Sequence, residues 1–254
     1  MLTKKLWKRG ISLLGAAAMT ASMLTGISFA EGETYTQPTL NPHSKSVLEV
    51  DGYQFIDLNG NGELDVYEDW RQDAETRAAD LVSQMTVREK IAQMQHPTYL
   101  PRADGKIAPY LKDYCSEYGI GMLLIRELNS VEAAATTMNT IQEYAESSRL
   151  GVPVLVSMDS VHGLSYVSGA PVTPHNLALA ATRDEALVTK LAEIARDEHL
   201  AVGVRMTLSP EADIASEPRW GRVMETFGED PDLVTQMVTA QVVAFQNGRD
   251  GLNT

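Results

Sequence analysis

Asp159 is the residue whose type and position most clearly suggest ligand binding. It follows an apolar run directly and opens the segment Asp159-Ser160-Val161-His162-Gly163. A carboxylate in this position can accept charge-assisted hydrogen bonds from two neighbouring hydroxyls, such as those of one sugar ring. The alternative is an aspartate that caps its own loop, because Asp is common in turns for its own hydrogen-bonding reasons.

A second candidate is Arg222, which lies in a charged loop after the next apolar run. Its guanidinium could donate to sugar hydroxyls or hold a carboxylate in position. Trp220 could offer an apolar face to a ligand, although a core position under the loop is the favoured interpretation. For Arg219 the simpler expectation is an ion pair inside the loop, with Glu217 or Asp213.

The sequence assigns no catalytic role to His162 or to the pair of carboxylates Asp159 and Glu225. His162 could donate to a ligand, but a loop histidine satisfied by backbone groups is favoured. Asp159 and Glu225 are the residue types of an acid and base pair. Because carboxylates are abundant and the sequence gives no separation between them, we assign no pair.

Residues 57–68 have the composition of a calcium-binding loop. They satisfy every position of the pattern D-x-[DN]-x-[DN]-G-x5-E, with Gly62 at the turn and Leu64 as the apolar anchor. The expected oxygen ligands are Asp57, Asn59, Asn61, Glu63, Asp65 and Glu68. The alternative is an Asx-rich turn that caps the next helix without metal. We therefore expect a structural Ca2+ at most, and no cofactor for catalysis.

Two helices are expected between this calcium-type loop and the strands. The first has apolar residues at i, i+3, i+4 and i+7, which are Ala78, Leu81, Val82 and Met85. Thr86 with Glu89 forms a capping box that begins the second.

From residue 121 onward, short apolar runs alternate with helical patterns. The expected strands are residues 122–125, 152–158 and 202–208. Asn129 caps the first helix of this series, and Thr182 with Glu185 caps the second. The inner stripe of the second helix is predicted to be Leu187, Leu191 and Ile194.

The third helix of the series begins with Asp230 as its cap and Pro231 at its first position. Alternating strands and helices predict an α/β fold with a parallel sheet and right-handed crossovers. At about 45 residues per unit, a closed (β/α)8 barrel needs roughly 360 residues, but this chain has 254.

The favoured fold is therefore an incomplete TIM-barrel-like domain over residues 76–254, with three to four βα units. The alternative is a small open α/β sheet that is complete as it stands. No Gly-rich phosphate loop follows any expected strand, so the nucleotide-binding role common to such sheets has no support.

The first 30 residues have the pattern of a secretory signal peptide. Lys4, Lys5, Lys8 and Arg9 precede an apolar run over residues 11–27, and Ser28-Phe29-Ala30 follows it. A membrane-spanning helix needs about 20 apolar residues, and this run is shorter. We therefore expect a secreted or periplasmic protein with no stable membrane span after removal of the signal.

Residues 31–50 are polar and resemble a linker or extended arm, and residues 51–75 hold the calcium-type loop and its flanks. Cys115 is the only cysteine, so an internal disulfide is impossible. With 21 Lys and Arg against 34 Asp and Glu, the formal net charge is −13. That balance makes a nucleic-acid partner unexpected.

Several long motifs resemble the family 3 glycoside hydrolases, and more narrowly their β-glucosidase and β-xylosidase branch. They span residues 85–91, 157–163, 174–182 and 217–231. The Asp-Leu-Asn-Gly-Asn-Gly stretch is also similar to an N-terminal insertion in bacterial members. The β-N-acetylglucosaminidase branch is a weaker match, because Trp220-Gly221-Arg222 and Glu225-Thr226 follow the glucosidase pattern.

The resemblance implies a (β/α)8-like domain of a retaining hydrolase that acts on terminal β-glycosidic bonds of a carbohydrate. Asp159 matches the carboxylate that binds hydroxyls of the terminal sugar, and Arg222 matches an arginine of the same pocket. The Lys-His and nucleophile motifs of the family are expected beyond Thr254, and the acid/base is missing too. The resemblance thus implies no catalytic residue in this chain and little activity by itself. The alternative is a non-catalytic remnant that binds sugar or calcium.

Overall fold

The computed structural model describes residues 35–102 and 106–248. The chain divides into two units, Met1–Pro38 and Thr39–Thr254, and every helix and strand of the described residues lies in the second. The expected signal peptide, residues 1–30, lies outside the described residues.

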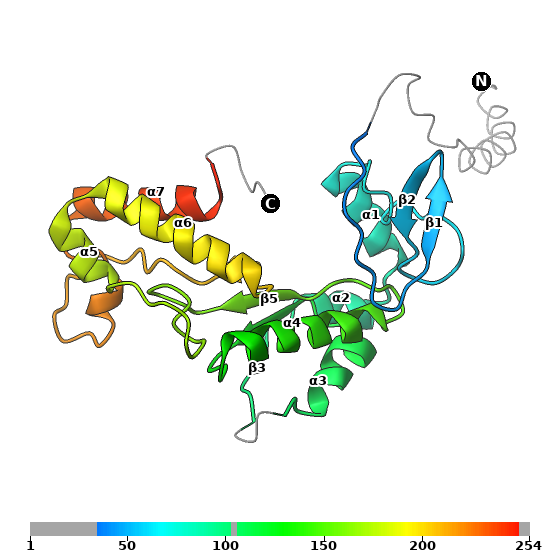
Figure 1. Ribbon diagram of the computed structural model, residues 1–254, viewed down its shortest axis with the longest axis horizontal. Coiled ribbons are helices and arrows are strands. Elements are labelled where there is room, and N and C mark those ends of the chain that lie inside the picture. The colour runs from blue at the N-terminus through cyan, green and yellow to red at the C-terminus, as the bar shows by residue number, and fades with distance from the viewer. Residues whose placement is uncertain (1–34, 103–105, 249–254) are drawn as a thin grey trace, which may run out of the picture. The chain divides into compact units, whose positions relative to one another are not determined.

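A parallel sheet forms the centre of the second unit, as Figure 1 shows. Its order is β3-β4-β5-β6, which are Thr98–Tyr99, Met122–Ile125, Leu155–Met158 and Met206–Thr207. Each strand pairs in parallel with the next one along the chain, which is the order of strands in a barrel. The prediction of an incomplete TIM-barrel-like domain is confirmed, and four βα units begin within the described residues.

Helices follow each of these strands (Figure 1). After β3 come α3 (Tyr110–Lys112) and the π-helix η1 (Asp113–Tyr118), and α4 (Val131–Glu146) follows β4. After β5 come α5 (Asn176–Thr182) and α6 (Glu185–Ala201), and after β6 come η2 (Val223–Glu225) and α7 (Pro231–Phe245).

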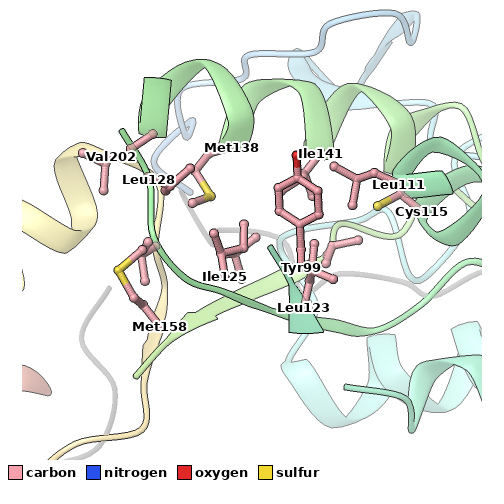
Figure 2. Packing of buried hydrophobic residues seen from close by; sticks show 14 of the residues in the cluster. Tyr99, Leu111, Cys115, Leu123, Ile125, Leu128, Met138, Ile141, Met158 and Val202 are labelled. Atoms are coloured by element: carbon pink, nitrogen blue, oxygen red, sulfur yellow. The ribbon is translucent and has the colours of Figure 1, made fainter. Parts of the chain in front are cut away.

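The main core lies between α4 and the sheet. Leu123 and Ile125 of β4 pack with Met138 and Ile141 of α4, and all four side chains are at most 2% exposed (Figure 2). Burying such side chains fully contributes about 1.5–3 kcal/mol each. A second cluster joins α5, α6 and α7 around Met237.

The N-terminal side differs from expectation at one point. Residues 35–46 contain no helix or strand, as an arm would, but β1 (Val47–Val50) forms an antiparallel hairpin with β2 (Tyr53–Ile56). Sequence patterning missed β1 because four residues are too few to show a period of two.

The two helices before the sheet are present as α1 (Ala74–Gln84) and α2 (Val87–Gln93), and the capping box at Thr86 is confirmed. The predicted apolar stripe is buried only at its end: Met85, the C-cap of α1, is 9% exposed. Within the described residues α1 itself has no buried residue, and Val82 is 48% exposed.

Several boundaries after residue 121 also shift. The strand expected over residues 202–208 shortens to β6, because Val202 is the C-cap of α6 and Gly203 turns the chain at a φ of 90°. Ser130, not Asn129, caps α4, and Asp184, not Thr182, caps α6. Thr182 instead ends α5, a helix that the sequence did not suggest.

The buried stripe of α6 is rotated by one residue from the prediction. Leu187 and Ile194 are 37% and 42% exposed. The buried positions are Val188, Ala192, Ala195 and His199. Small alanines allow α7 to approach closely, so hydrophobicity alone pointed to the wrong face of α6.

Candidate functional site

Asp159 lies at the carboxyl end of β5, beside Arg126 at the carboxyl end of β4. Because the two strands are parallel neighbours, their carboxyl ends bring these side chains together. Arg126 Nη2 donates to Asp159 Oδ2 at 2.6 Å, and the side chains are 36% and 17% exposed. Among the described residues Asp159 bonds to Arg126 and not to its own loop, which disfavours the turn-capping alternative.

Arg222 lies in the loop between β6 and α7, one residue before η2. Its Nε and Nη2 donate to Glu225 Oε2 at 2.8 Å and 2.5 Å, and it also forms an ion pair with Glu211. The hydrogen bond to Glu225 and the charges of Glu211, Glu225 and Asp159 raise the pKa of Arg222. Arg222 is thus close enough to Asp159 for the two charges to interact. Its guanidinium nitrogens, however, bind carboxylates of its own loop.

Glu211 adds a partly buried carboxyl group to this cluster, with a side chain that is 18% exposed. Burial raises the pKa of Glu211, and the neighbouring acids Asp213 and Glu225 raise it further. The positive charge of Arg222 acts in the opposite direction. The carboxyl ends of the strands therefore carry two arginines among several acids. Such a cluster can donate to and accept from the hydroxyls of a neutral polar ligand.

His162 and His175 lie against each other next to this cluster, with ring centres 4.1 Å apart. Both Nδ1 atoms are buried and have no hydrogen-bond partner among the described residues. The expectation that backbone groups satisfy His162 is therefore wrong for its Nδ1. Burial, with His175 nearby, lowers the pKa of His162, which favours its neutral form.

The remaining loop residues behave more simply. Arg219 pairs with Glu217 through two nitrogens, as expected, at 2.8 Å and 2.7 Å. Trp220 is only partly buried, so the prediction that it is a core aromatic is wrong.

The calcium-type loop forms a compact turn whose acids accept hydrogen bonds from the backbone. Asp57 accepts from Asn61 N and Gly62 N, both at 3.0 Å. Glu68 accepts from the N–H groups of Leu58, Asn59 and Asp65. Asp57 and Glu68 are 3% and 4% exposed, and burial raises the pKa of Glu68.

Three of the expected calcium ligands converge on one point. The side-chain amides of Asn59 and Asn61 both donate to Asp65 Oδ2, each at 2.7 Å. Among the contacts of the described residues, Glu63 takes part through its backbone N–H, which donates to Asn61 Oδ1. In the described part of the chain, no group of three or more His, Cys, Asp or Glu side chains could hold a metal ion. The donors fit a cation only if both amides turn their oxygens inward, since a side-chain amide offers a donor on one side and an acceptor on the other.

Sequence reasoning missed Arg126, although a usable signal was present. It directly follows the strand 122–125, just as Asp159 follows the next strand. In parallel sheets both positions lie at the edge where ligands bind. Applying that rule to every strand would have found it.

The sequence matches the model of a known domain, described as "Glycosyl hydrolase family 3 N terminal domain", over residues 86–251. This range contains β3 to β6 and both candidate residues, Asp159 and Arg222.

Curated relatives agree with that match. A periplasmic β-glucosidase/β-xylosidase of Dickeya chrysanthemi is 40% identical over 233 residues, which are 85% of this chain and 35% of the relative. β-Glucosidase C of Emericella nidulans is 33% identical over 72% of this chain and 31% of its own length. The chain thus spans about a third of the length of these relatives.

Solved structures show the same relationship. A β-glucosidase of Erythrobacter marinus is 32% identical with a TM-score of 0.64, over 73% of this chain and 25% of that one. A family 3 β-N-acetylglucosaminidase of Paenibacillus sp. has a TM-score of 0.60 at 25% identity, over 64% of this chain and 31% of that one. From the matched domain, the strand order and these relatives, the chain belongs to glycosyl hydrolase family 3.

Proposed function

We propose that this chain supplies part of the substrate site of an exported β-glucosidase or β-xylosidase. The observation that carries the proposal is the charged cluster at the carboxyl ends of β4, β5 and β6, where barrel enzymes bind substrate. Two relatives, a β-glucosidase/β-xylosidase and a β-glucosidase, support this choice of activity.

In this proposal Asp159 accepts hydrogen bonds from hydroxyls of the terminal sugar, and Arg222 donates to the same sugar. Charge-assisted hydrogen bonds of this kind are about twice as strong as neutral ones. Neither residue attacks the anomeric carbon, and catalysis with retention needs a nucleophile and an acid/base that we do not assign within residues 1–254.

A calorimetric titration with D-glucose tests the binding role. We expect the purified protein to bind glucose, and Asp159→Asn to weaken binding about 10- to 100-fold, because a hydrogen bond to a charged group contributes about 1.5–3 kcal/mol. Asp197→Asn is the matched control, because Asp197 is 68% exposed and pairs with Arg196 on α6. Equal affinity in Asp159→Asn and the wild type would contradict the role.

The alternative is a non-catalytic protein that binds sugar or calcium. It also predicts glucose binding, but no hydrolysis of nitrophenyl β-glycosides by the product of the complete gene. Hydrolysis that depends on Asp159 would exclude it.

Export is proposed from the signal-peptide pattern of residues 1–30 and from the relative of Dickeya chrysanthemi, which is named as periplasmic. None of the helices within the described ranges has the length and apolar character needed to cross a bilayer. N-terminal sequencing of the protein from the culture medium or periplasm tests this proposal, which expects the mature chain to begin at Glu31.

We also propose that the calcium-type loop binds a structural Ca2+. The loop pattern supports it, and turning the side-chain amides of Asn59 and Asn61, which now donate to Asp65, would bring three oxygens together. We expect millimolar CaCl2 to raise the thermal midpoint by several degrees over EDTA, because a ligand that binds only the folded state stabilises it. Asp57→Asn, which lowers the charge of the loop, should reduce that shift. Identical midpoints in CaCl2 and EDTA would favour the metal-free turn.

A further inference from the structure

Arg126 connects the loop after β4 to the carboxylate on which the proposed sugar site depends. Its Nη2 donates to Asp159 Oδ2 at 2.6 Å, and its Cζ lies 5.4 Å from the centre of the Tyr166 ring. Its Nε is buried and has no partner among the described residues. The guanidinium therefore meets the carboxylate through one nitrogen, and not through the forked pair of bonds that Arg often makes.

The surrounding backbone fixes the position of Arg126. Its N–H donates to Tyr99 O of β3 at 3.4 Å, and Leu128 N–H donates to Tyr166 O at 2.8 Å. Between them, Glu127 has a φ of 60°. A left-handed conformation is uncommon outside glycine and persists where the surroundings determine it. The loops after β4 and β5 are thus joined, and the Arg126 side chain lies at their junction.

The pairing leaves one oxygen of Asp159 available. In the described part of the chain, Oδ2 accepts the bond from Arg126, whereas Oδ1 accepts none. A forked contact would occupy both oxygens, and no contact would leave the carboxylate free to rotate. A single contact fixes the rotation and keeps one acceptor open to a ligand.

We propose that Arg126 is a positioning residue of the sugar site, which holds Oδ2 of Asp159 so that Oδ1 faces substrate hydroxyls. The ligand class is a terminal β-D-glucosyl or β-D-xylosyl group. This inference rests on the proposed function and adds a residue that makes no contact of its own with the sugar.

A double-mutant cycle measured as glucose affinity by calorimetry tests the inference. We expect Arg126→Met to weaken binding about fivefold to tenfold, less than Asp159→Asn does, because it releases the carboxylate from its fixed position without removing the carboxylate. Combined with Asp159→Asn it should add no further loss, since Arg126 acts only through Asp159. Arg126→Lys should restore part of the affinity, because it keeps a donor.

Arg219→Met is the matched control, because Arg219 forms an ion pair with Glu217 in an exposed loop. It should leave glucose affinity unchanged, and thermal unfolding should confirm that every variant folds. Equal affinity in Arg126→Met and the wild type would overturn the inference. The inference would also be overturned if the losses of binding free energy in the two single variants added up in the double variant.

A second measurement separates this inference from the proposed function. If the wild type binds no glucose, the proposed function fails, and the carboxyl carbon-13 signal of Asp159 decides the role of Arg126. We expect Arg126→Met to move or broaden that signal and Arg219→Met to leave it in place. An unchanged signal in Arg126→Met would contradict positioning by Arg126.

Discussion

Gly151 lies where the calcium-type loop approaches the turn before β5. It has a φ of 61°, and a Cβ built on it would come within 2.4 Å of the carbonyl oxygen of Leu58. Next to it, Tyr67 Oη donates to Leu150 O at 3.2 Å. The absence of a side chain at residue 151 therefore lets the loop and the sheet approach each other.

Gly151→Ala is expected to destabilise the protein by about 2 kcal/mol more than Gly169→Ala, measured by urea unfolding. Both substitutions place alanine at a positive φ, which costs about 1–2 kcal/mol. Gly169 has a φ of 85° and no heavy atom within 4 Å of a built Cβ, so it lacks the clash. Equal losses of unfolding free energy in the two variants would show that the close contact with Leu58 does not affect stability.

The placement of single residues was predictable where their position relative to a strand determined it. The position of Asp159 could be predicted because it directly follows the mostly apolar run 152–158, of which residues 155–158 form the strand. The partners of Arg222 could not, because Glu211 and Glu225 are only two of many acids in that loop. Arg219 paired as expected because Glu217 is two residues away.

The N-terminus of α2 is connected to the turn before β5 through Glu89. Glu89 closes the capping box with Thr86, and Arg149 donates to its two oxygens at 2.8 Å and 2.6 Å. The hydrogen bonds from Arg149 lower the pKa of Glu89 to about 2 against the opposing effect of burial. A depressed pKa means that the stabilisation is fully present above the ordinary value and is lost as pH falls toward about 2.

Glu89→Gln should lower the free energy of unfolding by about 1–2 kcal/mol at neutral pH, through the weakened cap and the lost ion pair. The difference from the wild type should shrink as pH falls from about 5 to 2, measured by denaturant unfolding across pH. Glu193→Gln is the control, because its ion pair with Lys190 lies on the exposed surface of α6, and its difference from the wild type should stay near zero at every pH. A pH-independent difference in Glu89→Gln would contradict the electrostatic explanation.

Helices and strands were predicted best where they are long or where capping residues mark their ends. The start of α7 was correct because Asp230 and Pro231 form a strong local signal. The two-residue strands β3 and β6 were missed or overextended, because their pairing with β4 and β5 is a property of the sheet. The buried face of α6 was misjudged because packing against α7 favours small residues over large ones.

For the whole molecule, alternating strands and helices were enough to predict an incomplete barrel-like fold, because that rhythm is spread over more than a hundred residues. The calcium-type loop shows the limit of such reasoning. Its pattern is met in full, yet its acids accept from their own backbone, and only a titration with Ca2+ separates the two interpretations.

The central claim is that Asp159 anchors the terminal sugar of a family 3 glycoside hydrolase. The most direct test is hydrolysis of nitrophenyl β-D-glucoside and β-D-xyloside by the product of the complete gene, as wild type, Asp159→Asn and Asp197→Asn. We predict that the wild type and Asp197→Asn hydrolyse at least one substrate, and that Asp159→Asn lowers kcat/KM by about 10- to 100-fold. Unchanged kcat/KM in Asp159→Asn, or no hydrolysis of either substrate by the wild type, would contradict the claim.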